Sequence, residues 1–385
     1  MSGRPRIALC LEYSLGLRGG VSVIVEEVVA GLSNEFEFIL ASPDEPAALA
    51  AHPVSSHLAG HLPLSFDDLS TSDLPRCLHE SGVRMAHFHA GGAYGWGNCW
   101  PVASLPERCS REGVTCLWTD HLVIDTFNGY LGGSRPLPVR MAAFPFAWAG
   151  KLRQMRAVAC EVAVSEHDRT LLAARYFPLS SRLRRLYHSR LNESEPASSE
   201  IRRQEILNVG HIAFRKGQHI LAAAFASIAA ECPGWSLVLA GHDAGDGCWQ
   251  EIERIIAAAR LEGRIHLLGA VDDVAALQRR AAIYVQPSIH EALGLALQEA
   301  IFRGCPAVGT RAGGIPEVID EGVTGLLVPP SDPVAMAAAL QKLIAQPELR
   351  EKFSAAGRAS IIAKKMTRQG MLDSHRALYR EFTTA

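Results

Sequence analysis

The sequence has little of what marks several large classes of protein. Its 38 lysine and arginine residues and 40 aspartate and glutamate residues nearly cancel, which leaves a formal net charge of -2. A chain without a basic excess has no global field for nucleic acid or for an anionic membrane, so we expect no nucleic-acid partner. Residues 7–11 are apolar but lack a signal-peptide cleavage pattern, and no uncharged stretch reaches the ~20 apolar residues of a membrane span.

The nine cysteines are odd in number, scattered, and never arranged as C-x-x-C. This pattern argues for reduced thiols in a cytoplasmic protein and against a disulfide framework or a zinc site. The glycine-rich segment 91–97 is not G-x-G-x-x-G, which counts against a dinucleotide-dependent oxidoreductase. With 385 residues, 48% of them hydrophobic and 20% charged, the chain is predicted to be globular and to hold two domains.

The stretch 283–328 carries the clearest chemical signal. Residues 282–285 suit a buried strand, Glu291 follows in a loop, and residues 296–302 suit a helix that includes Glu299. A glutamate therefore lies on each side of a helix N-terminus, whose free amides form an anion site. Carboxylates beside such a site suit sugar hydroxyls, because hydroxyls are good hydrogen-bond donors.

Glu291 and Glu299 lie within P-S-x-x-E-x-x-G-L-x-x-x-E-A, followed by G-x-P and by G-G-x-x-E-x-I-x-x-G-x-T-G-L-L-V. This ordered run resembles the nucleotide-sugar site of the retaining glycosyltransferases of family 4, which have the GT-B fold. For an isolated pair of glutamates, the better explanation would be a Rossmann-type unit with two solvated surface carboxylates.

Further motifs of the second half are similar to the same family. Residues 206–209 restart the strand–loop–helix pattern, and Lys216 matches the lysine of the family's K-G motif, which contacts the donor diphosphate as a point charge. His211 stands where the family usually has an arginine. Either Arg215 supplies that charge from a neighbouring position, or the diphosphate is held more weakly. The resemblance also implies that the backbone near Val271 reads the base edge.

The first half begins with a predicted buried strand at 6–11, followed by Gly19, Gly20 and a predicted helix at 21–32. A glycine pair at a helix start allows the backbone to approach a phosphate, although an ordinary tight turn also explains it. The pair is similar to the family's G-G-x-x-x-x-V-x-x-L segment, which implies contact with the donor phosphate or the acceptor.

Three histidines lie at the ends of predicted strands. His87 and His89 resemble an H-x-H strand end and point the same way, so a metal site is conceivable; without a third ligand, a packed or cleft-lining pair is favoured. The predicted strand 114–121 ends at His121, and the carboxyl ends of strands are where ligands bind in open α/β sheets. The resemblance places His121 beside the transferring sugar, and a satisfied structural histidine is the alternative.

Two segments give weaker signals. Residues 44–74 lack clear periodicity and are predicted to be a variable loop with short elements. Residues 135–156 are apolar with basic ends, which suits either core packing or a membrane surface. Because three prolines interrupt the segment, a clean amphipathic helix is not expected, and core packing is favoured.

The resemblance implies an α/β protein of the GT-B class, with two Rossmann-like β/α/β domains facing across a cleft. We expect an N-terminal acceptor-side domain at 1–190, a linker at 192–200, and a C-terminal nucleotide-sugar domain at 201–366. Residues from about 367 to 385 are expected to form a helix that crosses back to the N-terminal domain.

The same resemblance implies a retaining glycosyltransferase that moves a sugar from a nucleotide-diphosphate sugar, most commonly a UDP-sugar, to an acceptor hydroxyl in glycan, glycolipid or small-molecule glycoside synthesis. Glu299 would bind the ribose and Glu291 the sugar hydroxyls. Lys216 and the amides of Gly294 and Leu295 would hold the diphosphate.

Neither a metal nor another cofactor is expected, and His121, Lys216 and Glu291 are the expected catalytic residues. The protein is expected in the cytoplasm. Peripheral contact with the inner face of the membrane is compatible with that location. The alternatives are an inactive GT-B scaffold that binds a nucleotide or a partner, and a GT-B nucleotide-sugar epimerase or hydrolase.

Overall fold

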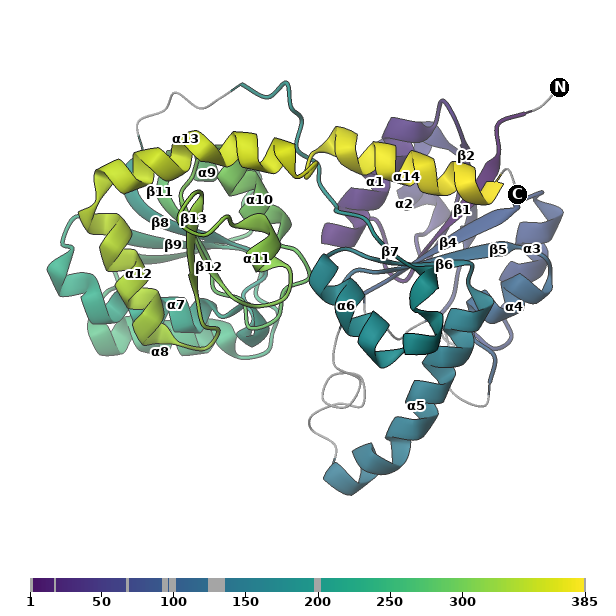
Figure 1. The fold of residues 1–385 in the computed structure, drawn as a ribbon, viewed down its shortest axis with the longest axis horizontal. Helices are drawn as coiled ribbons and strands as arrows, with labels where there is room; N and C mark the ends of the chain where they lie inside the picture. Colours follow the sequence, from purple (N-terminus) through teal and green to yellow (C-terminus); the bar gives the residue numbers. More distant parts are fainter. Residues whose placement is uncertain are drawn as a thin grey trace. The chain divides into compact units, whose positions relative to one another are not determined.

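The computed structural model describes residues 3–16, 19–66, 69–91, 96, 102–123, 136–196 and 202–383. Contacts divide the chain into an N-terminal unit, Met1–Arg190 with Arg368–Ala385, and a C-terminal unit, Leu191–Thr367. Each unit contains a parallel β-sheet flanked by helices (Figure 1).

The sheet of the N-terminal unit has the strand order β3-β2-β1-β4-β5-β6-β7 within the described residues, and all its pairs are parallel. Its strands are β1 (Arg6–Leu11), β2 (Glu37–Ser42), β3 (Leu58–Pro63), β4 (Met85–Ala90), β5 (Thr115–Asp120), β6 (Cys160–Ala163) and β7 (Leu183–Arg185). The central strands are buried, as expected for a parallel sheet covered on both faces: β1 is an apolar run, whereas β4 also buries His87 and His89. The strand order reverses between β1 and β4, which makes their carboxyl ends the switch point of this sheet.

The helices of the N-terminal unit are α1 (Gly20–Leu32), α2 (Pro46–Ala50), α3 (Leu74–Glu80), α4 (Leu105–Arg111), α5 (Leu137–Ala157), α6 (Glu166–Arg175) and α14 (Arg368–Thr383), with short 3-10 helices at Pro53–His57 and Phe177–Arg182. The segment 44–74 is more regular than its sequence suggested, because it contains the edge strand β3, paired with β2. This strand was missed because its side chains are only partly buried and so give no clear apolar alternation.

Helix α5 corrects the prediction for residues 135–156. The helix is continuous through Pro145, and its first half exposes apolar side chains, with Met141 61% and Phe146 58% exposed. Pro145 is tolerated there because the backbone groups it leaves unbonded can reach water. Core packing holds only for the second half, where Leu152 and Met155 join a cluster with Leu172 and Tyr176. Residue 135 lies outside the described residues. No described helix has both the length and the apolarity needed to cross a membrane.

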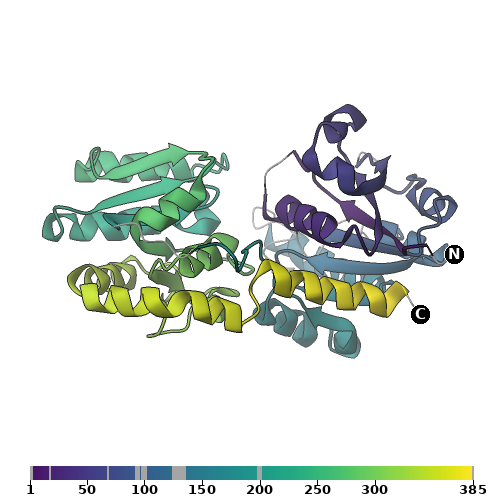
Figure 2. The same ribbon diagram turned by 90° about the horizontal axis from the view of Figure 1, so that it is seen from above.

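Helix α14 packs beside α1 in the N-terminal unit (Figure 2). Tyr379 is fully buried, with its ring 5.6 Å from that of Phe36. Arg376 and Arg380 each donate to Glu35 at 2.8 Å. Buried aromatic contact and surface ion pairs together hold this last helix on the first unit.

In the C-terminal unit the described strands have the order β10-β9-β8-β11-β12-β13, again all parallel. The strands are β8 (Arg203–Val209), β9 (Ser236–Ala240), β10 (Ile265–Gly269), β11 (Ala281–Gln286), β12 (Ala307–Thr310) and β13 (Gly325–Val328). The helices are α7 (Gln218–Ile228), α8 (Cys248–Ala259), α9 (Val274–Arg280), α10 (Leu295–Phe302), α11 (Ile315–Val318), α12 (Pro333–Ala345) and α13 (Pro347–Ala363), with 3-10 turns at Phe214–Lys216 and Ala229–Glu231. The switch point of this sheet lies between β8 and β11.

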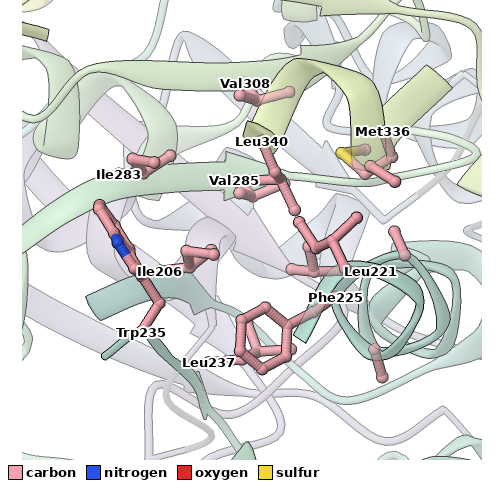
Figure 3. Close-up of a cluster of buried hydrophobic side chains, with 14 of the residues drawn as sticks. Ile206, Leu221, Phe225, Trp235, Leu237, Ile283, Val285, Val308, Met336 and Leu340 are labelled. Carbon is pink, nitrogen blue, oxygen red and sulfur yellow. The ribbon is translucent and has the colours of Figure 1, made fainter. Parts of the chain in front are cut away.

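The core of the C-terminal unit lies between this sheet and helices α7 and α12 (Figure 3). Ile206, Ile283 and Val285 of the central strands are completely buried against Leu221 and Phe225 of α7. These contacts fix the two strands whose carboxyl ends carry the polar loops described below.

The described part of the expected linker, 192–196, is bound to the C-terminal unit. Arg303 Nε donates to Glu195 Oε1 at 2.7 Å, and Thr367 Oγ1 donates to Glu193 Oε1 at 2.7 Å. Residues 197–200 of the expected linker lie outside the described residues.

Candidate functional site

The polar loops of the C-terminal unit meet at its switch point. Lys216 ends the short turn after β8, and Glu291 lies in the loop after β11. Ile289 N donates to Arg215 O at 2.8 Å, so backbone hydrogen bonding holds one loop against the other. The sheet topology and this bond bring together two residues that are 75 positions apart in sequence.

Two glycines permit this close approach. Gly217 has φ +75, and a Cβ at this position would lie 2.0 Å from the carbonyl oxygen of Pro287. Gly313 has φ +54, and its Cβ would lie 1.6 Å from the carbonyl oxygen of Glu291. Both positions need glycine for the conformation and for the space. The glycines of the K-G and G-G motifs therefore position the charged residues.

Glu291 is held by three donors on one oxygen. Lys216 Nζ donates to Oε2 at 2.7 Å, and Gln286 Nε2 and Ser288 Oγ each donate to the same atom at 3.0 Å. Burial alone would raise the pKa of Glu291, but the Lys216 ammonium and the hydrogen bonds outweigh it and lower the pKa below its usual range. The carboxylate is therefore ionised, next to a fixed positive charge.

His211 and Arg215 lie around the same pair. The pKa of His211 is lowered, first by burial and then by the nearby charges of Lys216, His242 and Arg215. His211 is thus neutral at pH 7. The charge of Arg215 contributes to lowering the pKa of Glu291, so Arg215 is a second cation beside this carboxylate.

The N-terminus of α10 adds backbone donors next to Glu291. Gly294 is the residue before the helix, with φ +89 and no side-chain cap on the first turn, which begins at Leu295. A Cβ on Gly294 would lie 3.7 Å from Glu291 Cγ. The first amides of a helix have no intrahelical acceptor, so these N–H groups are available to an anion beside Lys216 and Glu291.

The second predicted glutamate is less accessible. The side chain of Glu299 is 5% exposed, and its Oε2 lies 3.6 Å from Arg303 Nη1 on the next turn. Ribose binding by Glu299 stays a prediction, and the carboxylate already has one cationic partner. Val271 follows β10, at the same carboxyl edge of the sheet but two strands away from β8.

The predicted site residues of the N-terminal unit also lie at carboxyl ends of strands. Helix α1 begins at Gly20, with Gly19 extended before it and accepting from Val23 N at 3.2 Å. His121 directly follows β5, and its backbone N–H donates to Ala90 O at 3.0 Å. The helix start after β1 and the histidine after β5 flank the end of β4, next to the switch point of this sheet.

The histidine pair on β4 is packed and hydrogen-bonded. His87 contacts Thr119 Oγ1 through Nε2 at 2.7 Å and Tyr379 Oη through Nδ1 at 3.0 Å. His89 Nδ1 lies 3.0 Å from His121 Nε2. Among the described residues, no group of three or more histidine, cysteine or acidic side chains is arranged to hold a metal ion.

Several polar residues near these sites were not predicted from the sequence. Gln286 and Ser288 both donate to Glu291. Gln286 ends the buried strand β11 and Ser288 lies two residues after it, and this position at a strand end is the signal that could have identified them. Glu12 directly follows β1 and accepts from Gly91 N at 3.1 Å; burial raises the pKa of its carboxyl to about 7. His188 and His375 lie beside the other histidines only through tertiary contacts, so no local pattern indicates them.

A buried charge cluster supports the strand before His121. Lys151 Nζ lies 2.8 Å from Glu161 Oε1, and Trp118 Nε1 donates to Asp120 Oδ1 at 2.7 Å. Burial, followed by the nearby Glu161, raises the pKa of Asp120 well above its usual range, despite the opposing charge of Lys151. Lys151 Nζ is thus shared between two buried carboxyl groups, at 2.8 Å from Glu161 Oε1 and 3.9 Å from Asp120 Oδ2.

A cavity of about 580 Å³ in the C-terminal unit lies away from this chemistry. Its lining includes Arg203, Ala282 and Pro306, which are at or near the amino ends of β8, β11 and β12. The charged loops lie at the opposite, carboxyl ends, so this cavity is not the candidate donor site.

Comparison with known proteins first defines the fold. The structure matches that of Anabaena HepE in complex with UDP and glucose, with a TM-score of 0.74 and 15% identity over 97% of this chain and 99% of that chain. Together with the two parallel Rossmann-like units, this match gives the fold class as GT-B.

Sequence comparison then supports the family. Residues 192–360 match the family described as glycosyl transferases group 1. The chain is 27% identical to the alpha-D-kanosaminyltransferase of Streptomyces kanamyceticus over 62% of this chain and 64% of that protein. It is 26% identical to the D-inositol 3-phosphate glycosyltransferase of Frankia alni over 94% of this chain and 95% of that protein. The chain is thus similar to group 1 glycosyltransferases in its C-terminal unit and to named glycosyltransferases over most of its length.

Proposed function

We propose that this protein is a retaining glycosyltransferase of family 4 that transfers a sugar from a nucleotide-diphosphate sugar to an acceptor hydroxyl. The observation that carries the proposal is the Lys216–Glu291 pair at the switch point of the C-terminal sheet, beside the N-terminus of α10. UDP is the proposed nucleotide, which the UDP bound to the structurally similar HepE supports.

Positive charge at this site suits the diphosphate. Lys216 is a compact point charge, and the first amides of α10, at Gly294 and Leu295, provide directed donors. Breaking the sugar–phosphate bond develops negative charge on the leaving diphosphate, and fixed donors stabilise that charge more in the transition state than in the ground state. Because the ammonium and amides supply this stabilisation, we propose that transfer requires no divalent metal.

Glu291 suits the hydroxyls of the donor sugar. Its Oε2 already accepts from Lys216, Gln286 and Ser288, whereas no described residue donates a hydrogen bond to Oε1. The side chain is 10% exposed, so Oε1 is the atom that can accept from a sugar hydroxyl. A carboxylate with three donors on one oxygen is a poor nucleophile, so we propose front-face attack assisted by the departing phosphate, with retention of configuration.

The remaining roles follow the resemblance to the family. Glu299 is proposed to bind the ribose, the backbone near Val271 to read the base, and Gly19 with Gly20 to contact phosphate or acceptor. His121 is proposed to contact the transferred sugar. The N-terminal unit would bind the acceptor. Contact between the protein and a membrane surface is a further proposal, which the exposed apolar side chains in the first half of α5 suit.

A thermal-shift and product-release screen tests this proposal. The purified protein would be incubated with a panel of nucleoside diphosphates and their sugars, with and without candidate acceptors, in the presence and absence of EDTA. We expect one nucleotide to raise the melting temperature of the wild type and to have no effect on Lys216→Ala or Glu299→Ala. NMR of the product should show the anomeric configuration of the donor.

Other outcomes would point to the alternatives. A nucleotide shift without any product would favour an inactive scaffold, for which the histidine at position 211 is the supporting feature. Product without an acceptor would indicate an epimerase or hydrolase. If no nucleotide or nucleotide sugar shifts the melting curve, the transferase proposal is wrong.

A further inference from the structure

Five histidines of the described residues form a closed ring of contacts in the N-terminal unit. They are His87 and His89 on β4, His121 after β5, His188 after β7 and His375 on α14. Their ring centroids lie 4.2 Å (His87–His89), 5.2 Å (His89–His121), 5.0 Å (His121–His188), 5.8 Å (His188–His375) and 6.2 Å (His375–His87) apart. Burial, followed for most of them by the neighbouring imidazoles, lowers the pKa of all five rings. All five are therefore neutral at pH 7.

Neutral imidazoles have one donor and one acceptor nitrogen, so each hydrogen bond fixes a tautomer. His375 Nδ1 donates to Met371 O at 3.0 Å, because a carbonyl can only accept. The bond between His89 Nδ1 and His121 Nε2, at 3.0 Å, is the one imidazole–imidazole hydrogen bond among the described residues. One of these two nitrogens must therefore carry the proton and the other must not.

The surroundings of His89 indicate which nitrogen carries it. Its Nε2 is buried and has no hydrogen-bond partner in the described part of the chain. If Nε2 were protonated, a buried N–H donor would be left unsatisfied, and unpaired acceptors are tolerated better than unpaired donors. His89 therefore carries its proton on Nδ1 and donates it to His121 Nε2. His121 must then be protonated on Nδ1.

We infer that His89 is a positioning residue that orients the His121 ring and holds it in the tautomer that presents an Nδ1–H donor to the sugar. The inference rests on the proposed function, in which His121 contacts the transferred sugar. The ligand atom that faces His121 is then an acceptor, such as a hydroxyl oxygen of the donor sugar. The sheet supports this geometry, because His89 pairs with Thr119 across β4 and β5 and is 1% exposed.

Steady-state kinetics of four variants tests the inference. His121→Ala should lower kcat about 100-fold, the effect of removing one transition-state donor. His89→Ala should lower kcat about tenfold with an unchanged KM for the donor, because the catalytic ring stays but loses one hydrogen bond. The kcat of His89→Asn should be within about threefold of the wild-type value, because the amide nitrogen of asparagine occupies the place of the imidazole Nδ1. His89→Gln should not recover, because its amide reaches the place of Nε2.

A double variant and a packing control distinguish positioning from a general structural role. Adding His89→Ala to His121→Ala should change kcat by less than about twofold, because the two residues act as a unit. His188→Leu, which changes a ring that packs on His121 without a hydrogen bond to it, should retain kcat within about threefold. An equal loss from His89→Ala in both backgrounds, or equal effects of Asn and Gln at position 89, would overturn the inference.

The tautomer itself can be measured without activity. Side-chain 15N–1H NMR of histidine-labelled protein, assigned by comparison with His121→Ala, should show His121 protonated on Nδ1 in the wild type and a mixture of tautomers in His89→Ala. Protonation on Nε2 in the wild type would overturn the inference and leave the proposed function standing. If His121→Ala has wild-type activity, the role of His121 in the proposed function is wrong instead.

Discussion

The two units place different chemistry at the same position of the same topology. At the switch point of the C-terminal sheet, Lys216 and Glu291 lie 2.7 Å apart, and the ammonium lowers the pKa of the carboxylate. Next to the switch point of the N-terminal sheet, buried imidazoles are held neutral and bonded to one another. The fold thus determines where each site lies, and the side chains determine whether it suits a charged diphosphate or neutral hydroxyls.

Removing the charge from the C-terminal site should give the largest effect. Lys216→Ala removes the cation proposed to hold the diphosphate and leaves Glu291 without its ammonium partner. We expect kcat/KM for the donor to fall about a thousandfold, measured by nucleotide release. Lys342→Ala on α12, the same charge change at an exposed position, is the control and should retain activity. Comparable losses in the two variants would contradict a specific role for Lys216.

The second prediction concerns the histidine cluster: acid should lower the free energy of unfolding through the buried ring of His375. The pKa of His375 is lowered by burial from its usual 6.5 to about 4, so between these values the unfolded chain binds a proton that the folded chain does not. The neutral ring therefore makes its full contribution to the free energy of unfolding above pH 6.5. Roughly 3 kcal/mol of that free energy is lost as the pH falls toward 4. We expect His375→Asn, which retains a donor in the place of Nδ1, to reduce this loss in denaturant unfolding followed across pH.

The control for that measurement is His79→Asn on the surface of α3. An effect of the same size in both variants would show that the loss does not come from the buried His375 ring. An unchanged pH dependence in His375→Asn would mean that the ring is not held neutral by its surroundings.

The next prediction concerns the close contact between the backbone at Gly217 and the carbonyl oxygen of Pro287 in the C-terminal site. Gly217→Ala introduces a side chain at φ +75 that would lie 2.0 Å from Pro287 O, so the loop must move and carry Lys216 away from Glu291. We expect a loss of about 2 kcal/mol in unfolding free energy and weaker nucleotide binding. Gly245→Ala has a similar φ, +74, with nothing near its Cβ, and tests the conformational cost alone. Equal effects at both positions would show that the contact with Pro287 does not matter.

The smallest effect concerns Glu12, a half-buried carboxyl that follows β1 and accepts a hydrogen bond from Gly91 N after β4. Burial raises its pKa from 4.5 to about 7, so ionisation above pH 7 costs folding free energy that is absent below pH 4.5. Glu12→Gln should therefore raise stability at pH 8 and not at pH 4, by about 1 kcal/mol, which is less than the roughly 3 kcal/mol of the full pKa difference because the side chain is only half-buried and water screens its charge. Thermal unfolding at the two pH values, with exposed Glu112→Gln as the control, measures this difference. A gain of the same size at both values would contradict the assigned pKa.

The sequence predicted the local pattern of the C-terminal site well, because its signals are local. A buried strand, a loop glutamate and a helix start follow one another between 282 and 302, and the structure has β11, Glu291 and α10 there. The contact between Lys216 and Glu291 depends on strand order, which periodicity does not give. The packing of Glu299 against Arg303 was missed as well, although a spacing of four residues on a helix could have suggested it.

The N-terminal unit was harder to predict for physical reasons. Its histidine cluster joins residues from β4, β5, the segment after β7 and α14, so only tertiary structure brings them together. Core packing was predicted for all of 135–156 because apolar residues are usually buried, but the first half of α5 exposes side chains such as Met141 and Phe146. Strand β3 gave no clear pattern because an edge strand has few buried side chains.

Isothermal titration calorimetry with UDP tests most directly whether the diphosphate binds to the charged pair of the C-terminal unit and not to the histidine cluster of the N-terminal unit. We expect the wild type and His121→Ala to bind UDP with similar affinity, because the neutral histidine cluster contributes nothing to the diphosphate. Lys216→Ala should bind at least tenfold more weakly. Equal UDP affinity in wild type and Lys216→Ala, or loss of binding in His121→Ala, would contradict the assignment of the diphosphate to the charged pair of the C-terminal unit.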